Sequence, residues 1–593
     1  MASNPVLGSL GIFSVEMIQQ IALEVHNLSR QSMFALLRVN KSFYSIIRPL
    51  AFREVRFDMT ETLQGSPATP ETRDLKQLET LLYEIDSSHS TFFNCVRRVT
   101  VISQGSVYPG YSRAERDWRV QSSITERFSY WNEYMQQRWS TFVSIIDRVC
   151  NLHDITFDCL EPVPITLLEV LHKRHPSSRL HVRNWSPSLH LPLRAEIDFD
   201  SKDLYDLALA KSSCLYSVET VGRWQNGYVL STFYDVCFER MVSLAPNLQQ
   251  VNYKLSGHDD TDVRLGVSPG PAMVEKYEVP TLIVLEGLAR NKPVRKKWTS
   301  LSWNALTFDR FRRLCRFVDF SHLERLKLGS FWNKDILEYA TERQIFAGLK
   351  ELSLRVPDTR VVQPYNPSED VITKSTISDF VCSCGPLESL SIVDYYDYLD
   401  VFSVILTHRE TLQSLSLHEV EHSSKPRPML SVEDIEAIIH MVPHLKNLEL
   451  DINRGEREVE AEILEVIESA PSLETLTIYY DLGLRHAFWD INLMDADAKK
   501  DRERLNRRYR SVDERFGRQI WDALHSGSLR SSLDGIGRLT LYIGEPSREN
   551  GFWERFWRHE YTTKQKIEVR RDYETGCCWK CDVVVTVEGP RNV

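Results

Sequence analysis

The chain repeats one short pattern of apolar and polar positions, apolar-x-x-apolar-x-apolar, six times between Leu323 and Ile478. The copies are LERLKL (323–328), LKELSL (349–354), LESLSI (387–392), LQSLSL (412–417), LKNLEL (445–450) and LETLTI (473–478), at intervals of 26, 38, 25, 33 and 28 residues. Side chains alternate between the two faces of an extended segment. The pattern therefore predicts a short strand at each copy, with the three apolar positions inward and the intervening positions outward.

Segments with apolar positions at helical spacing separate these copies. They include 335–346, 398–408, 431–442 and 458–470. Strand, turn and helix recurring at such intervals are typical of a leucine-rich-repeat solenoid, in which no unit buries its apolar face without a neighbour. Weaker copies occur at 152–157, 215–220, 248–253, 301–303 and 536–541. A further match at Leu204, Leu207 and Leu209 has helical character and is interpreted as a chance match.

The first 57 residues form a distinct helical unit that ends in the extended segment FREVRF (52–57). Ser14 is placed to cap a helix with two apolar stripes, one of Val15, Ile18, Ala22 and Val25 and one of Met17, Ile21 and Leu28. A second helix carries Met33, Leu36 and Leu37, and a third carries Phe43, Ile46, Ile47 and Leu50 and is expected to end at Pro49. Because about fifty residues bury little surface alone, the second stripe predicts a binding partner.

Segment 13–55 resembles the F-box. The resemblance rests on an opening of Phe13, Ser14, Val15 and Glu16, a centre of Val39, Asn40, Lys41 and Phe43, and an end of Phe52, Arg53 and Val55. Ser14 stands where Pro is usual in the family, and Phe52 where Trp is usual. An F-box followed by leucine-rich repeats is the order found in substrate receptors of SCF ubiquitin ligases.

The resemblance implies docking on a Skp-type adaptor and, through it, on a cullin scaffold. The residues expected to bind the adaptor are Phe13, Val15, Ile18, Ile21, Val25, Leu36, Val39 and Phe43. The solenoid face would hold a protein substrate. Receptors of this kind supply no catalytic residue and no cofactor, so the chain is not expected to be an enzyme.

The predicted fold is an α/β leucine-rich-repeat solenoid, an irregular horseshoe, preceded by a small three-helix F-box-like domain. The predicted domains are an F-box-like helical domain at 1–57, a linker and helical connector at 58–144, the solenoid at 145–545 and a C-terminal β-hairpin cap at 546–593. The cap rests on the alternating pattern of 567–589, which could close the open edge of the solenoid.

The outward positions of the repeated strands form the predicted substrate-binding face. Aromatic and charged groups gather there, and Tyr is enriched at recognition surfaces. The predicted residues are Arg355, Asp394, Tyr395, His418, Asp451, Tyr479 and Tyr480. The alternative is that these are ordinary solvated residues at strand ends.

Charge and composition narrow the possible partners. The net charge of −10 over 593 residues argues against nucleic acid, because phosphate binding needs a basic surface. No stretch approaches eighteen consecutive apolar residues, which argues against a membrane span. Eleven cysteines without paired spacing fit a reducing compartment, so the expected location is intracellular, cytoplasmic or nuclear.

Three motifs were considered as catalytic or metal sites. GVSPG (266–270) matches a serine nucleophile pattern, but Pro269 has no N–H to stabilise an oxyanion. Cys578-x-x-Cys581, with Cys577 beside it, lacks a second pair of zinc ligands nearby in the sequence. The acidic run from His258 to Asp262 lacks the Gly and the final Glu of a calcium loop. We therefore expect no catalytic residue and no metal site, with incidental thiols favoured over metal binding at the terminal cysteines.

Two other functions stay open. The N-terminal helices could cap a repeat scaffold that has no link to ubiquitination, because terminal caps are required in such arrays. An enzyme that uses the terminal cysteines is the third hypothesis.

Overall fold

The computed structural model describes most of the repeat region and the N-terminal helices. The described residues are 14–28, 32, 35–39, 41–59, 91–103, 124–159, 161–185, 204–223, 237–256, 295–332, 334–356, 372–420, 427–453, 457–480, 514–525, 536–543, 565–571 and 583–588. The linker predicted at 60–72 lies outside them.

The chain divides into two compact units. The first comprises Met1–Gly222 and Leu230–Asn252, and the second comprises Arg223–Val229 and Tyr253–Val593. The division therefore falls inside the region predicted as one solenoid, within strand β6 (Gln250–Ser256).

The first unit begins with helices and continues with strands that alternate with helices. Its elements are α1 (Val15–Leu28), α3 (Lys41–Ala51), β1 (Glu54–Asp58), α5 (Thr91–Cys95), β2 (Arg98–Ser103), α7 (Ile124–Arg148), β3 (Asp154–Cys159), α8 (Ile165–Arg174), β4 (Arg179–Trp185), α10 (Leu204–Ala210) and β5 (Leu215–Arg223). Ser14 caps α1, because its Oγ accepts the N–H of Met17 at 3.3 Å. The helical character predicted around Leu204 is confirmed by α10.

The prediction that Pro49 ends the third helix is wrong, because α3 continues to Ala51. A proline removes only its own N–H, and Phe52 still donates to the carbonyl of Arg48 at 3.1 Å. The helix therefore includes Pro49 in its last turn.

Parallel strand pairing in the first unit starts earlier than residue 145. Strands β1, β2, β3, β4 and β5 pair in chain order, all parallel. Strand β2 thus lies within the span 58–144, which the sequence assigned to a linker and connector. Helix α7 supplies the aromatic core of this part, with Trp139 5.1 Å from Phe157 and 5.7 Å from Phe142 between ring centroids.

The second unit repeats strand and helix more regularly. Its elements are β7 (Ser300–Leu306), α14 (Phe308–Leu314), the 3-10 turn η4 (Phe320–His322), β8 (Arg325–Trp332), α15 (Lys334–Glu342), β9 (Glu351–Arg355), α17 (Lys374–Ser383), β10 (Ser389–Val393), α18 (Val401–His408), β11 (Ser414–His418), α19 (Val432–Met441), β12 (Asn447–Ile452), α20 (Arg457–Glu468), β13 (Thr475–Tyr480), α23 (Glu514–Ala523), β14 (Arg538–Ile543), β15 (Gln565–Arg571) and β16 (Val583–Glu588). Strands β7 to β14 pair in chain order and are all parallel. All six copies of the repeated pattern contribute a strand, as predicted.

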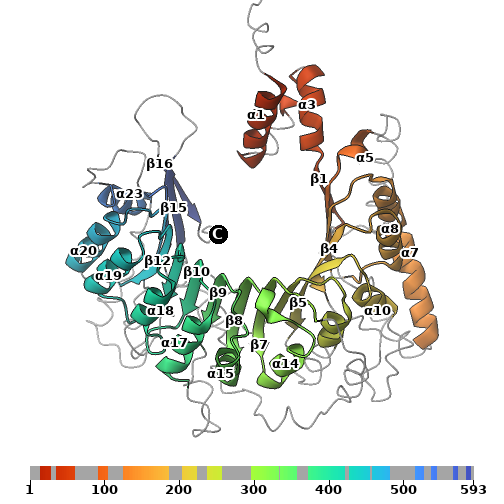
Figure 1. The fold of residues 1–593 in the computed structure, drawn as a ribbon. Coiled ribbons are helices and arrows are strands. Elements are labelled where there is room, and N and C mark those ends of the chain that lie inside the picture. Colours follow the sequence, from red (N-terminus) through yellow and green to blue (C-terminus); the bar gives the residue numbers. More distant parts are fainter. Residues whose placement is uncertain are drawn as a thin grey trace, which may run out of the picture. The chain divides into compact units, whose positions relative to one another are not determined.

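Cross-strand register explains the spacing of leucines in the pattern. The middle apolar position of the six copies, and of the weaker copy at 536–541, is in register from strand to strand and at most 4% exposed. These residues are Leu326, Leu352, Leu390, Leu415, Leu448, Leu476 and Leu539. The helices lie along one side of these strands (Figure 1). Helix α19, for example, begins with a capping box of Ser431 and Asp434 and buries Ile435, Ile438 and Ile439. The opposite side of the strands, which we call the strand face, carries the outward positions.

A backbone ladder joins successive repeats. The carbonyl of the residue before one strand accepts two consecutive N–H groups at the start of the next strand. Lys350 O, just before β9, accepts the N–H groups of Glu388 and Ser389 at 2.7 and 3.0 Å. The same pattern occurs in the first unit, where Arg53 O accepts the N–H groups of Arg97 and Arg98 at 2.8 and 2.9 Å. The ladder therefore defines the repeat even where leucines are absent.

Close approach of neighbouring turns requires glycine at two positions. A Cβ on Gly385 would lie 2.2 Å from the carbonyl oxygen of Ala347, and one on Gly348 would lie 2.3 Å from that of Ser321. Both contacts are with backbone atoms, which cannot rotate away.

The last two strands run differently. Strand β15 pairs antiparallel with β14, and β16 pairs antiparallel with β15. This agrees with the alternating pattern that predicted a hairpin at the open edge. No helix in the described part of the chain is long and apolar enough to cross a membrane.

Candidate functional site

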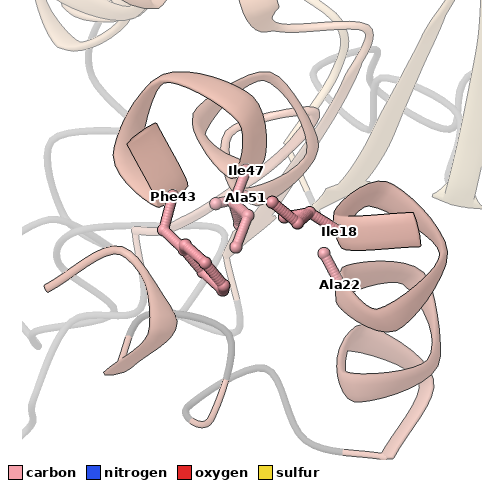
Figure 2. Packing of buried hydrophobic residues seen from close by; sticks show 5 residues of the cluster. All are labelled: Ile18, Ala22, Phe43, Ile47 and Ala51. Atoms are coloured by element: carbon pink, nitrogen blue, oxygen red, sulfur yellow. The ribbon is translucent and has the colours of Figure 1, made fainter. Parts of the chain in front are cut away.

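Helix α1 has one buried and one exposed apolar side. Ile18 and Ala22 are buried and face Phe43, Ile47 and Ala51 of α3 (Figure 2). Val25, Leu36 and Leu37 are half-buried against the same core. This small core holds the helices together and fixes which side of α1 faces outward.

Helix α1 exposes large apolar side chains on both flanks of its buried stripe, Met17 and Ile21 on one flank and Val15 and Leu23 on the other. Val15 is 49% exposed, Met17 50%, Ile21 41% and Leu23 37%, and we call these four residues the α1 surface. Val39 and Tyr44 are also exposed, at 40% and 43%. Several large apolar side chains exposed on one short helical unit indicate a place where another protein binds.

The residues predicted to bind an adaptor divide into three groups. Val15, Ile21 and Val39 are exposed, and Val25 and Leu36 are half-buried. Ile18 and Phe43 are only 5% and 6% exposed, so their assignment to a docking surface was wrong. Their side chains form the core between α1 and α3 and are not available to a partner. Phe13 lies outside the described residues.

Met17, Leu23 and Tyr44 are exposed but were not among the predicted residues. The spacing of Met17 and Ile21 is the signal that could have found Met17, because residues four apart lie on one stripe, here beside the core stripe. No comparable signal exists for Leu23 and Tyr44, since their exposure depends on how the helices pack.

The second candidate surface is the strand face at the carboxyl ends of β9 to β13. The structure brings Arg355, Asp394, His418, Asp451 and Tyr479 together there, as predicted. Arg355 Nε lies 3.6 Å from Asp394 Oδ2, and His418 Nδ1 lies 2.7 Å from Asp451 Oδ1. Arg355, Asp394 and Tyr479 are partly exposed. His418 and Asp451 are only 7% and 5% exposed, so the prediction that these two side chains contact a substrate was wrong, because they pair with each other beneath the surface.

Two of the predicted substrate-binding residues do not reach this surface. Tyr395 is 2% exposed and Tyr480 is fully buried. Tyr480 points to the helical side, where its hydroxyl donates to Glu460 Oε1 of α20 at 2.6 Å and its ring contacts Phe516 of α23. The prediction was wrong for both. Tyr480 is buried because consecutive residues of a strand face opposite sides and Tyr479 takes the outward one. Tyr395 lies in the turn after β10, where its side chain is buried.

Asp451 is the centre of a buried polar network. Its carboxylate contacts Arg427 Nη1 at 3.1 Å, with both side chains 2% exposed, and accepts the backbone N–H of Glu419. Arg427 also donates to the carbonyls of Ile452 and Tyr479 at 3.1 and 2.8 Å. A buried ion pair with these extra hydrogen bonds ties the turns after β11, β12 and β13 together. His418 and Asp451 therefore support the strand face from within.

Glu419 adds a buried carboxyl group to this network. Burial raises the pKa of Glu419 to about 8, with further contributions from the nearby Asp394 and Asp451. One of its oxygens accepts the backbone N–H of Tyr396 at 2.6 Å. At neutral pH this group therefore carries a proton in most molecules.

Asp394 occupies an unusual backbone conformation, with φ of 62°. Aspartate tolerates the left-handed region better than most residues do. Its Oδ1 accepts the N–H of Val420 at 3.2 Å, so this side chain shapes the turn after β10 as well as pairing with Arg355.

An aromatic stack covers the outward side of β11, β13 and β14. The ring of Tyr479 lies 4.3 Å from that of His418 and 5.2 Å from that of Tyr542 between centroids. The Tyr479 hydroxyl donates to Glu449 Oε2 at 3.1 Å. Burial, together with Glu449, raises the pKa of Tyr479, so this hydroxyl stays protonated and acts as a donor.

One serine, histidine and aspartate line up on strands β5, β4 and β3 of the first unit. Ser217 Oγ lies 2.8 Å from His181 Nδ1, and His181 Nε2 lies 3.3 Å from Asp154 Oδ1. Arg98 and Arg179 also bind this carboxylate, and burial lowers the pKa of His181. Since two guanidinium groups share the aspartate, the arrangement is a cross-strand ladder of polar contacts.

The other motifs considered for chemistry lie outside the described residues. They are GVSPG (266–270), the acidic run 258–262 and the cysteines at 577, 578 and 581. Within the described part of the chain, no cluster of three or more His, Cys, Asp or Glu residues could hold a metal ion.

Comparison of the sequence with protein-family models and with curated proteins gave no match.

Proposed function

We propose that the chain is the substrate-recognition subunit of an SCF-type ubiquitin ligase. In this proposal residues 13–55 act as an F-box that docks on a Skp-type adaptor, and the strand face of a leucine-rich-repeat solenoid holds the target protein. The protein supplies no catalytic residue, and ubiquitin transfer to the target is promoted by proximity within the assembled ligase.

The observation that carries the proposal is the α1 surface. Its four apolar side chains are 37–50% exposed although the helix already packs a core through Ile18 and Ala22. Burying a side chain of this type contributes roughly 1.5–3 kcal/mol. Several such side chains on one helix are enough to hold a partner helix or groove without any charged contact.

Direct binding to a purified Skp-type adaptor tests the proposal. Ile21→Asp and Met17→Asp, made in the full chain, place a charge in the apolar contact and should weaken adaptor binding at least about 100-fold. Both side chains are exposed, so neither change disturbs the core between α1 and α3.

Gln136→Asp is the control. Gln136 is exposed on helix α7, outside the N-terminal helices, whereas Gln19 lies one turn from both Val15 and Leu23 of the α1 surface. The Gln136 substitution introduces the same charge and should leave the affinity unchanged. The proposal fails if the wild-type chain does not bind the adaptor, or if the two apolar positions respond no more strongly than Gln136.

The alternative is a repeat scaffold in which the N-terminal helices serve as a cap. It is favoured by the direct connection of α3 to β1, where Arg53 O begins the backbone ladder of the first unit. A cap and an F-box differ in one respect that can be measured, because only an F-box recruits a cullin.

A further inference from the structure

Five outward residues of the second unit form one row across adjacent strands. Strand register aligns Lys327 of β8 with Ser353 of β9, Ser391 of β10, Ser416 of β11 and Glu449 of β12. Lys327 is exposed, and the other four are partly exposed. We call these five residues the serine row, since three hydroxyl side chains separate one cation from one anion.

The row continues beyond Lys327 to Ser302 of β7, which is in register with Lys327 and partly exposed, but it is closed beyond Glu449. The next two positions in register, Thr477 and Thr540, are only 6% and 7% exposed. The stacked rings of Tyr479 and Tyr542 stand beside them. Glu449 is therefore the last accessible residue of the row on this side.

Both charged ends keep capacity to bind. Lys327 makes no ion pair with any described residue. Glu449 Oε2 accepts from Ser416 Oγ at 2.9 Å and from the Tyr479 hydroxyl at 3.1 Å, while Oε1 takes no hydrogen bond from the described residues. The neighbouring Arg355 is already paired with Asp394.

Two further charged residues, one basic and one acidic, lie close to Lys327. Arg325 precedes Lys327 by two residues on the same strand and is also exposed. Glu351 is exposed on β9 in register with Arg325. These two partly cancel, which leaves Lys327 as the cationic end of the row.

We propose that the serine row binds an extended peptide segment that carries an acidic side chain over Lys327 and a basic side chain over Glu449. Adjacent strands lie about 4.8 Å apart, so four steps span about 19 Å. An extended chain advances about 3.3 Å per residue. The two charged residues of the peptide are thus about six positions apart.

The inference rests on the proposed function, because it assigns a class of target to the strand face of the receptor. Small serine side chains let a peptide backbone approach the strands, and their hydroxyls can both donate and accept hydrogen bonds. Opposite charges at the two ends select the partner and fix its placement, as complementary charges do at protein interfaces. The peptide can run in either direction along the row and still place its acidic residue over Lys327 and its basic residue over Glu449.

Synthetic peptides test the length and charge requirement. Fluorescein-labelled peptides of Ser, Ala and Gly carry one Glu and one Lys, in either order, separated by two to ten positions. Fluorescence anisotropy with the full chain at low salt should show the tightest binding at a separation of about six. A separation of two reaches only about 7 Å and should bind about two- to fivefold more weakly, because only one charged pair can then form and an exposed pair contributes about 0.2–1 kcal/mol. A separation of ten can span the row only by bending, and should bind less tightly than six.

Charge reversal at each end should switch the preference in opposite directions. Lys327→Glu makes both ends acidic and should favour the peptide with two Lys residues over the one with Glu and Lys. Glu449→Lys makes both ends basic and should favour two Glu residues. Lys173→Glu on helix α8 changes the net charge as Lys327→Glu does, and should leave the preference unchanged.

The inference is overturned if no peptide binds, if affinity does not depend on separation, or if the reversals leave the preference unchanged. Adaptor binding is measured on the same preparations. Loss of the peptide preference with intact adaptor binding overturns only the inference about the row. Loss of adaptor binding with an intact peptide preference overturns the proposed function and leaves the row as a peptide-binding surface.

Discussion

The α1 surface and the serine row are built from opposite chemistry. The first presents four large apolar side chains on a helix, and the second presents three serines between a lysine and a glutamate on parallel strands. Burial of apolar area is non-directional and supplies affinity, whereas charge complementarity supplies selectivity. The difference fits a protein that holds one constant partner by its helices and selects another by its strands.

The two surfaces also rest on different supports. The α1 surface stands on a core of five buried residues from two helices. The serine row stands on a ladder of aligned leucines and on the buried network around Asp451. The strand face should therefore tolerate changes at its surface better than changes at the network beneath it.

The largest effect is expected from Asp451→Ala. It leaves the guanidinium of Arg427, which is 2% exposed, buried without its ion partner. Breaking a buried pair in this way costs about 3–5 kcal/mol. Urea unfolding combined with hydrogen exchange in β12 and β13 measures the loss.

Asp379→Ala is the matched control, since Asp379 is an exposed aspartate on α17. It should change the free energy of unfolding by less than about 0.5 kcal/mol. Equal effects of the two substitutions would show that the network does not support the strand face.

The next effect compares two isoleucines of α1. Ile18→Ala removes a buried side chain and should cost about 2–5 kcal/mol of local stability. Ile21→Ala removes one that is 41% exposed, and should cost less than about 1 kcal/mol while still weakening adaptor binding. Proteolysis rates and helical circular dichroism of the full chain compare the stabilities of the two variants. A less stable Ile21→Ala than Ile18→Ala would contradict the assignment of Ile18 to the core and Ile21 to the exposed surface.

A smaller effect is expected in the pH dependence of stability. The pKa of Glu419 is about 8 in the folded protein against an ordinary value of 4.5, so the folded state binds the extra proton between these values. Stability from this group is therefore fully present below about pH 4.5 and decreases as pH rises to about 8.

Glu419→Gln isolates that contribution. Because the buried histidines His181 and His408 have lowered pKa values and act in the opposite direction near pH 6, the difference between wild type and variant is the quantity to follow. The wild type should lose stability relative to the variant as pH rises from 5 to 8. A constant difference over this range contradicts a raised pKa at Glu419.

The smallest effect concerns salt. Adaptor binding through the α1 surface should change less than about twofold between 0.1 and 0.5 M salt, because apolar burial is not screened. Peptide binding to the serine row should weaken by about threefold or more, since exposed ion pairs of 0.2–1 kcal/mol are screened. Isothermal titration with both partners measures this, and equal salt dependence would remove the distinction between the surfaces.

The fold of the second unit could be predicted from the leucine pattern, because register and burial depend on the same alternation of side chains. Strands β2 and β4 were missed. In this part aromatic side chains such as Trp139 fill the core, and the backbone ladder that defines the repeat has no signature in the sequence.

The candidate sites were predicted less completely. The second apolar stripe of α1 was found by its spacing, but Ile18 and Phe43 belong to the core, since spacing alone does not show which stripe faces α3. On the strand face, Tyr479 and Tyr480 were treated alike although alternation separates them. The buried placement of His418 and Asp451 depends on Arg427, which arrives from a turn that no periodic pattern marks.

Recovery of the intact chain from cells with its bound proteins tests the central claim most directly. Quantitative mass spectrometry of the wild type should detect a Skp-type adaptor and a cullin. Both should be lost with the Met17→Asp and Ile21→Asp double variant, while Gln136→Asp retains them. A wild-type chain that recovers no cullin, or a double variant that recovers as much of it as the wild type, would contradict the account.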